Sequence, residues 1–374
     1  MASLPLESEL SSLLGGDDKA RVMARYCGFD GLGGTTLQVV GAEFGITAER
    51  VRQILGEVVK RMADTHLPAP TLEKTLSFIA ERIPAWADEI EPKLLAAGLS
   101  ARPFRIEGVI RAAELLGRKP LFSVTETPKA RLVHRLSASA LDAVVRVARR
   151  AIERHGVTTV NAVAADLLEA APEAADGRLI TTVLAGAEEF RWLDRSSEWF
   201  WLPDVPRNPL VRRIRKILSV ANPVKFAELS SGVAREYRLQ SFTPPPAILL
   251  ELCRQVPDVE VEGEMIKANP RIDPHEVLSE LEEAIVEVLL AHGRVMRRAE
   301  LASLCLERGL NRSSFYGSLS HSPVIVPHAG GLLGVIGTLI KPDSTPPNAA
   351  PKRSSNYLHA KAKAHAISLH RLMQ

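Results

Sequence analysis

The amino-acid sequence predicts a mainly α-helical protein with an N-terminal helix-turn-helix followed by tandem winged-helix units, each of three helices and a β-hairpin. Two observations predict this fold class. Apolar residues recur at helical spacing on both sides of a glycine turn near residue 45. Further along, groups of helical segments each end in a pair of short alternating strands, and these pairs end at Leu202, Lys267 and Gly337.

Composition and charge narrow the class of protein. The chain has 374 residues, 46% of them hydrophobic and 24% charged, as in ordinary globular proteins. Its 47 Lys and Arg nearly balance its 44 Asp and Glu, so any basic surface must be local. Three widely spaced cysteines match no zinc or redox motif. No signal peptide and no run of ~18 apolar residues is present, so we expect a cytoplasmic protein, nucleoid-associated when bound to DNA, with no membrane partner.

Stretches rich in proline and polar residues divide the chain into six predicted segments. Residues 1–65 hold the helix-turn-helix, and residues 71–133 form a degenerate winged-helix-like unit because its strand signals are weak. Winged-helix units are predicted for residues 138–206, 207–270 and 274–340. Residues 341–374 carry six Lys or Arg and one acid after a Pro- and Ser-rich spacer, which predicts a basic flexible tail.

The sharpest motif runs from Thr36 to Ile54 and reads TLQVVGAEFGITAERVRQI. Gly45 permits a sharp turn between two helices, and Thr47 is a good N-cap for the second helix. Apolar residues at helical spacing predict one buried stripe on this second helix, formed by Val51, Ile54, Leu55, Val58 and Met62. The predicted opposite face carries Glu49, Arg52, Gln53, Gly56 and Lys60, with Arg50 and Arg61 beside it.

This motif resembles region four of the primary sigma factors of bacterial RNA polymerase, whose helix-turn-helix binds the upstream promoter element. The resemblance extends from Arg25 to Met62, and the matching positions are Thr36-Leu37, Val40-Gly41, Phe44-Gly45, Ile46-Thr47 and Glu49 to Ile54. It implies that the helix beginning at Thr47 contacts duplex DNA. Two departures limit what carries over. Ala48 stands where sigma factors usually have a basic residue, and the module lies at the N-terminus, so we expect a DNA-reading module that is not a sigma factor.

The outward side chains of this helix suit base recognition. Glu49 can accept a hydrogen bond from cytosine N4, Arg52 can donate two bonds to guanine, and Gln53 can pair with adenine. The side chains expected to hold phosphates are Arg50, Lys60 and Arg61, and Thr47 completes the predicted DNA contacts. The alternative is a solvated amphipathic helix in which Glu49 pairs with Arg52 or Gln53.

A second candidate surface lies in the predicted third helix of the last unit, within residues 311–320. Asn311 is a natural cap, and Phe315 and Leu319 are expected to face inward. The outward side chains that can contact phosphates or bases are Arg312, Ser313, Ser314 and Tyr316. A polar face turned to solvent explains the same pattern equally well.

The sequence carries no catalytic, metal or cofactor motif, so we do not expect an enzyme. The glycine-rich residues 31–34 have no strand before them and are predicted to form a loop rather than a nucleotide site.

The expected function is binding of double-stranded DNA, as a bacterial transcription regulator or as a DNA-recognition subunit. Two alternatives stay open. One is a protein-interaction scaffold that binds RNA polymerase or another protein subunit, since winged helices often dock proteins. The other is the recognition subunit of a phage-defence or restriction complex in which a different chain supplies catalysis.

Overall fold

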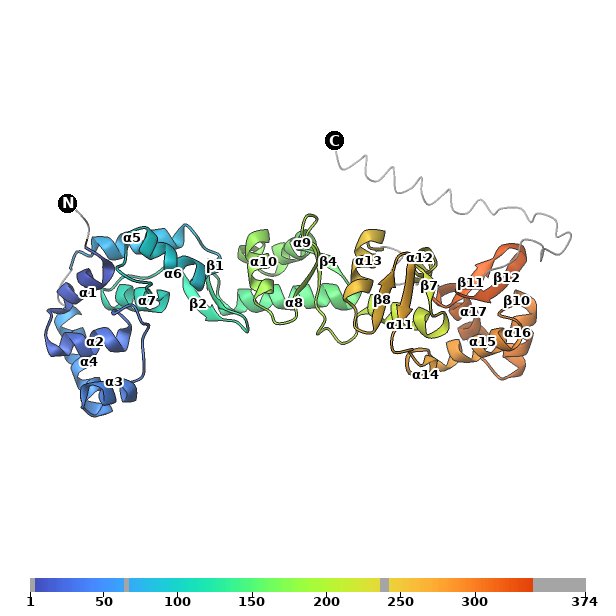
Figure 1. The fold of residues 1–374 in the computed structure, drawn as a ribbon, viewed down its shortest axis with the longest axis horizontal. Coiled ribbons are helices and arrows are strands. Elements are labelled where there is room, and N and C mark those ends of the chain that lie inside the picture. Colours follow the sequence, from blue (N-terminus) through green and yellow to red (C-terminus); the bar gives the residue numbers. More distant parts are fainter. Residues whose placement is uncertain (1–3, 64–66, 236–241, 339–374) are drawn as a thin grey trace, which may run out of the picture. The chain divides into compact units, whose positions relative to one another are not determined.

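The computed structural model describes residues 4–63, 67–235 and 242–338. This part of the chain is mainly helical with four small antiparallel three-stranded sheets, which confirms the predicted mainly α class (Figure 1). The chain divides into two compact units, Met1–Ile214 with Ser241–Val259 and Arg215–Gln240 with Glu260–Gln374. The basic tail predicted for residues 341–374 lies outside the described residues.

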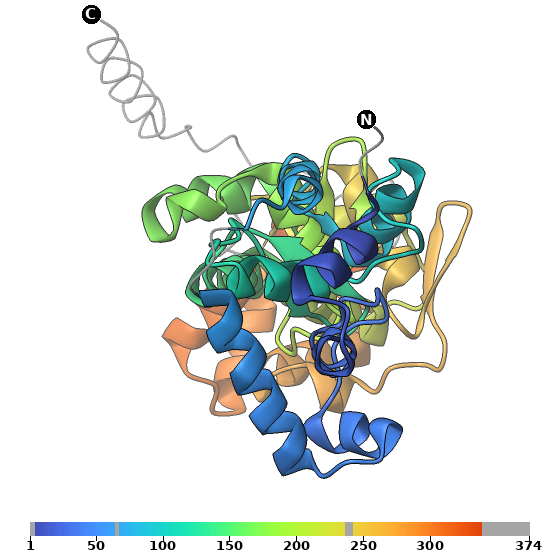
Figure 2. The same cartoon turned by 90° about the vertical axis from the view of Figure 1, so that its left-hand side faces the viewer.

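One hydrophobic core joins the helices and strands that open the first unit. The helices are α1 (Leu6–Leu14), α2 (Asp18–Cys27), α3 (Leu37–Phe44), α4 (Ala48–Ala63), α5 (Pro70–Ala80), α6 (Ala87–Ala96) and α7 (Ile106–Leu115). The strands are β1 (Ala85–Trp86), β2 (Ser123–Glu126) and β3 (Arg131–His134). Side chains from before and after residue 65 contribute to this core. The helices α3 and α4 lie at the opposite end of this group of elements from α5 (Figures 1 and 2).

A buried carboxylate fixes α1 on α5. Glu9 is only 7% exposed, and its two oxygens accept hydrogen bonds from the backbone N–H groups of Thr71 (2.8 Å) and Leu72 (2.9 Å). The first N–H groups of a helix have no partner within the helix, so Glu9 acts as a cap for α5. The N-terminal helices are therefore anchored to the next group of elements by a hydrogen-bonded charge as well as by apolar packing.

Three further groups of helices and strands follow along the chain. The second group comprises α8 (Ala138–His155), β4 (Thr158–Thr159), α9 (Val160–Ala170), α10 (Gly177–Ala185), β5 (Arg191–Asp194) and β6 (Trp199–Trp201). The third comprises α11 (Pro209–Val220), β7 (Val224–Lys225), α12 (Phe226–Ala234), α13 (Pro246–Gln255), β8 (Val259–Glu262) and β9 (Met265–Ala268). The fourth comprises α14 (Pro274–Val277), α15 (Glu280–Ala291), β10 (Val295–Arg297), α16 (Arg298–Glu307), α17 (Arg312–His321), β11 (Ile325–His328) and β12 (Leu332–Val335).

Every sheet has the same strand order. The short strand that precedes the last two helices of a group pairs with the last strand of that group, giving the orders β1-β3-β2, β4-β6-β5, β7-β9-β8 and β10-β12-β11. Thr158 thus faces Phe200, and Val295 faces Gly334. The sequence predicted only the hairpins. The additional strands were missed because segments of two or three residues are too short to show an alternating pattern.

Candidate nucleic-acid interface

The turn between α3 and α4 has the geometry predicted from its sequence. Gly45 ends α3 with a φ of 67°, a left-handed conformation that favours glycine, and the next N–H, of Ile46, donates to the Gly41 carbonyl (2.9 Å). The Thr47 hydroxyl accepts a hydrogen bond from the N–H of Arg50 (3.2 Å), as an N-cap does. Gly41 lies against the turn, where a β-carbon would come 2.7 Å from the Ile46 carbonyl oxygen. The two helices therefore meet at a close, well-capped corner.

The two faces of α4 differ as the periodicity predicts. Val51, Ile54, Val58 and Met62 are each at most 6% exposed and belong to the hydrophobic core, while Leu55 is partly buried. The exposed side chains are Glu49, Arg50, Arg52, Gln53, Lys60 and Arg61. Burial of the apolar stripe fixes the rotation of α4 about its axis, so these polar side chains face solvent.

Ion pairs and hydrogen bonds engage most of the exposed side chains near the start of α4. Arg52 Nη2 lies 2.6 Å from Glu49 Oε2, and Arg50 Nη1 donates to Gln53 Oε1 (3.2 Å). Arg50 also lies 3.8 Å from a carboxylate oxygen of Glu57. Exposed pairs of this kind contribute at most about 1 kcal/mol, so a ligand that offers better partners can replace them.

The two basic residues at the end of α4 have different surroundings. The Arg61 guanidinium donates to the Leu14 carbonyl (2.6 Å) and lies 3.3 Å from Asp17 Oδ2, so it ties α4 to the junction of α1 and α2. The Ala20 N–H and the Arg61 guanidinium hold the pKa of Asp17 below its usual value. Lys60 is exposed and forms no ion pair with any described residue. Of the pair, Lys60 is the more available to a phosphate.

The second predicted surface belongs to α17, in the second unit. Asn311 Oδ1 caps the helix by accepting from the Ser314 N–H (3.1 Å), and Phe315 and Leu319 are buried as expected. Of the four predicted contacts, Arg312, Ser313 and Ser314 are exposed. The fourth, Tyr316, is partly buried, and its ring centroid lies 6.0 Å from the Arg312 guanidinium and 5.3 Å from that of Arg298. Two arginines around one aromatic ring give this face a positive character.

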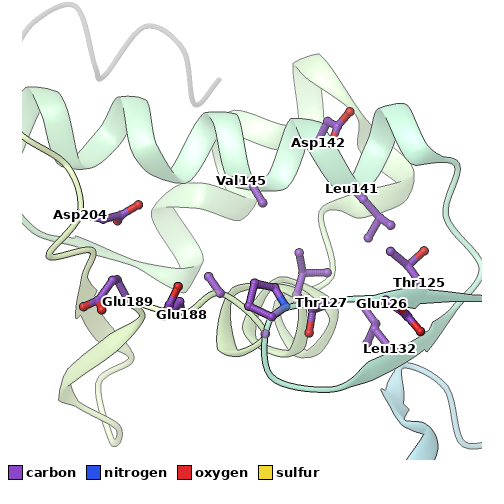
Figure 3. Close-up of a pocket in the computed structure, with 14 residues that line it drawn as sticks. Thr125, Glu126, Thr127, Leu132, Leu141, Asp142, Val145, Glu188, Glu189 and Asp204 are labelled. Carbon is purple, nitrogen blue, oxygen red and sulfur yellow. The ribbon is translucent and has the colours of Figure 1, made fainter.

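An open apolar pocket of about 440 Å³ lies in the first unit, where the β2–β3 turn meets α8 and the end of α10 (Figure 3). Its apolar lining includes Leu132, Leu141, Val145 and Val183. Its carboxylates are those of Glu126, Asp142, Glu188, Glu189 and Asp204. Carboxylates repel phosphates, so this pocket does not suit a nucleic acid. An apolar segment that also carries positive charge fits it better.

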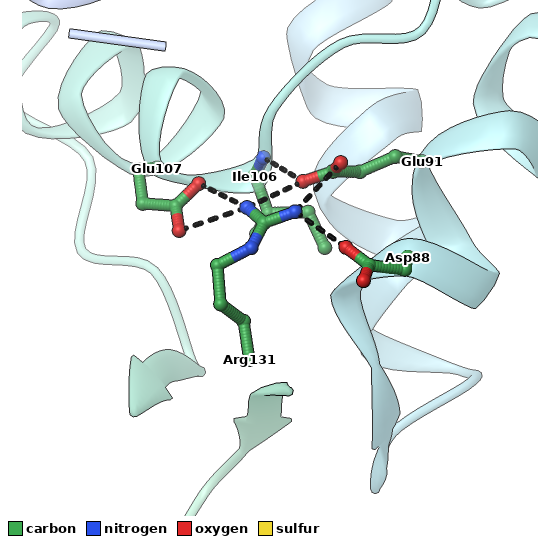
Figure 4. Close-up of polar contacts among 5 residues, drawn as sticks. All are labelled: Asp88, Glu91, Ile106, Glu107 and Arg131. Atoms are coloured by element: carbon green, nitrogen blue, oxygen red, sulfur yellow. Dashed lines mark hydrogen bonds and ion pairs between the residues drawn. The ribbon is translucent and has the colours of Figure 1, made fainter. Parts of the chain in front are cut away.

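Arg131 on β3 is surrounded by three carboxylates (Figure 4). It contacts Glu91 (2.9 Å) and Asp88 (2.7 Å) of α6 and Glu107 (3.0 Å) of α7. Glu91 also accepts a hydrogen bond from the N–H of Ile106 (3.2 Å). The hydrogen bonds that Arg131 donates to the three carboxylates, that to Glu91 first, raise its pKa. The cluster holds β3 against two helices, so its role is structural.

The described residues offer no metal site and no membrane-spanning helix, and sequence comparison identifies no family. Within residues 4–63, 67–235 and 242–338, no three His, Cys, Asp or Glu side chains are grouped so that they could hold a metal ion. None of the helices in these ranges is long and apolar enough to cross a membrane. No protein-family model matches the chain, and no curated protein is significantly similar to it.

Proposed function

We propose that this protein binds double-stranded DNA, with α4 in the major groove, and acts as a transcription regulator or as the DNA-recognition subunit of a larger complex. One observation carries the proposal. The corner formed by α3 and α4 buries the apolar stripe of α4 and turns Glu49, Arg52 and Gln53 to solvent. Those three side chains have the hydrogen-bonding groups that distinguish base pairs in the major groove.

The later groups of elements support the proposal. Each contains the order helix, strand, helix, helix, strand, strand, with the first strand paired to the last, and in the fourth group the short helix α14 precedes this series. This order is typical of winged-helix units, a variant of the helix-turn-helix, and we interpret the four groups in this way. In the fourth group α17 is then the helix that can enter a groove, with Arg312, Ser313, Ser314 and Tyr316 on its outer side.

Binding requires the exposed contacts of α4 to be exchanged for contacts with DNA. Arg52 can separate from Glu49 because an exposed pair of opposite charges is weak. Alternatively, the two side chains stay paired while each contacts a neighbouring base. Arg50 and Lys60 then meet phosphates on either side of the groove. Each phosphate that a basic residue neutralises releases counterions, so the affinity for DNA falls steeply as salt rises.

Selection of bound duplexes from a random pool, at low and at moderate salt, tests the proposal. We expect the low-salt pool to retain many sequences and the pool at moderate salt to be enriched in a common short motif. If the full chain retains no duplex at low salt, the proposal is wrong.

A protein-interaction scaffold is the second candidate, and the pocket bounded by Glu126, Asp142 and Glu188 is the observation that favours it (Figure 3). Its charge complements a partner segment with Lys or Arg beside apolar side chains, presented by RNA polymerase or by another subunit. The test compares capture of purified bacterial RNA polymerase by the wild type and by Glu126→Lys/Glu188→Lys. Capture by the wild type that the double variant loses supports this function, whereas equal capture, or none by either protein, rejects RNA polymerase as the partner at this pocket.

A further inference from the structure

Three arginines outside the helix-turn-helix lie along the glycine-rich loop that leads into α3. At Gly33, whose φ is 81°, a β-carbon would come 2.5 Å from Cδ of Arg105. At Gly34 a β-carbon would come 1.5 Å from Nη1 of Arg111, and at Gly31 it would come 3.3 Å from Cγ of Arg102. The absence of side chains on this loop therefore lets the arginines cross it in direct contact with its backbone.

Hydrogen bonds hold this loop beside α3. Arg25 Nη1 donates to the Gly33 carbonyl (3.3 Å), and Arg25 Nε donates to Glu43 of α3 (2.8 Å). The carbonyl of Tyr26 accepts both from the N–H of Thr35 (3.2 Å) and from Arg111 Nη1 (3.0 Å). Thr35 directly precedes Thr36, the N-cap of α3. The loop on which the three arginines lie is thus held next to α3, and Arg111 is itself hydrogen-bonded there.

The charge of this cluster is less compensated than that of α4. Arg102, Arg105 and Arg111 are exposed, and none of them forms an ion pair with a described carboxylate. On α4, by contrast, Arg50 and Arg52 each lie close to a glutamate. The nearby carboxylates are engaged elsewhere, Asp30 with Arg25 and Glu7 with the N–H of Ala101. Guanidinium groups gathered on one surface create a local positive potential, which is the property that attracts a polyanion.

We propose that Arg102, Arg105 and Arg111 form a second DNA contact, which holds the phosphate backbone beside the groove that α4 occupies. The inference rests on the proposed DNA binding and extends it. Guanidinium groups suit this role because each can donate two parallel hydrogen bonds to one phosphate. Arg102 and Arg105 contact phosphates directly. Arg111, whose Nη1 is already bonded to Tyr26, fixes the loop and adds charge.

Salt titrations of a double variant test this contact. The affinity of Arg102→Ala/Arg105→Ala for the selected duplex and for a scrambled duplex is measured across a range of salt concentrations. The slope of log K against log salt is negative, and we expect its magnitude to decrease by about 2, since each lost phosphate contact removes about 0.9. The loss should be equal for both duplexes because phosphates carry no sequence information. The matched control is Lys74→Ala/Lys93→Ala, which removes the same charge from exposed positions on α5 and α6 and should keep the wild-type slope.

Three results would overturn the proposal. One is a wild-type slope for Arg102→Ala/Arg105→Ala, another is an equal loss for the lysine control, and the third is a loss restricted to the selected duplex. Thermal unfolding of each variant shows whether it is folded. If the alanine variant is unstable, Arg102→Gln/Arg105→Gln keeps most of the packing on the loop and should show the same fall in slope. A wild type that binds no duplex at all refutes the proposed function itself, which separates the two failures.

Discussion

Glu49 and Arg52 form an ion pair of 2.6 Å across one turn of α4, with 57% and 69% of their side chains exposed. The guanidinium expected to donate to guanine therefore already has a carboxylate partner in the free protein. Near non-specific DNA the same carboxylate is repelled by phosphates, and only a suitably placed cytosine amino group offers it a favourable contact. We infer that Glu49 improves sequence discrimination at the expense of general affinity for DNA.

Glu49→Ala tests this relationship. We expect tighter binding to scrambled duplexes, because a negative charge is removed and Arg52 is released. We also expect a loss of ~1–3 kcal/mol of discrimination at the base pair that Glu49 contacts. Fluorescence anisotropy with the selected duplex and its single-base variants measures both effects. Glu81→Ala removes another exposed acid that pairs with an arginine, just after the end of α5. If it changes binding as Glu49→Ala does, the effect is only one of net charge.

Lys60 and Arg61 should respond differently to substitution although they are neighbours. Lys60→Ala should leave the thermal midpoint unchanged and reduce the salt slope of DNA binding by about 1. Arg61→Ala removes the contacts with Leu14 and Asp17, so we expect it to destabilise the first unit by about 1 kcal/mol. Unfolding midpoints and salt titrations of both variants check this, and a reversed pattern would show that the contacts of Arg61 are dispensable.

The Arg131 cluster should be essential for the stability of the first unit. Arg131→Met leaves Glu91, only 8% exposed, without its cationic partner, and we expect a loss of about 3 kcal/mol in the free energy of unfolding. The control Lys267→Met breaks solvent-exposed pairs with Glu260 and Glu262 and should change stability far less than Arg131→Met does. Urea unfolding compares the two variants. Equal losses would contradict the structural role of Arg131.

Stability should decrease on mild acidification because of His134. This side chain is 2% exposed, and burial lowers its pKa in the folded state below the usual value. The unfolded chain therefore binds more protons, so the stabilisation is complete above pH ~6.5 and is lost as the pH falls toward the lowered pKa, by at most about 1.4 kcal/mol per pH unit.

His134→Asn keeps an acceptor for the Leu136 N–H that now donates to His134 Nδ1 (3.1 Å), and it should flatten this part of the profile. The comparison uses the thermal midpoints of both proteins between roughly pH 5 and pH 7, an interval that contains the ordinary His pKa of ~6.5. Profiles of equal steepness would exclude His134 as a source. His155 and His328 also have lowered pKa values through burial, so a residual slope is expected in the variant.

The corner between α3 and α4 could be predicted from sequence because its signals are local. Gly45 has the φ it was expected to need, and Thr47 caps α4 through its own hydroxyl. The buried stripe from Val51 to Met62 followed from periodicity alone. The exposed partners of α4 were partly predictable, since Glu49 and Arg52 are one turn apart, but Asp17 and Leu14 are distant in sequence from Arg61 and gave no signal.

Features that depend on distant residues were not predicted. Glu9 caps α5 across more than sixty positions, and the two-residue strand β4 exists because Thr158 pairs with Phe200. The arginines beside the glycine-rich loop are separated from it in sequence, and only the fold brings Arg105 onto Gly33. A local pattern could identify residues 31–34 as a loop, but it could not show which side chains cover them.

Titration of the selected duplex with the wild type and with Arg52→Ala examines the role of α4 most directly. Arg21→Ala is the matched control, since Arg21 is also exposed and pairs with an acid three residues away, Asp18, on α2. We expect Arg52→Ala to lose ~1–3 kcal/mol and to relax discrimination at one base pair, while Arg21→Ala binds like the wild type. Wild-type affinity and discrimination in Arg52→Ala would contradict the placement of α4 in the major groove.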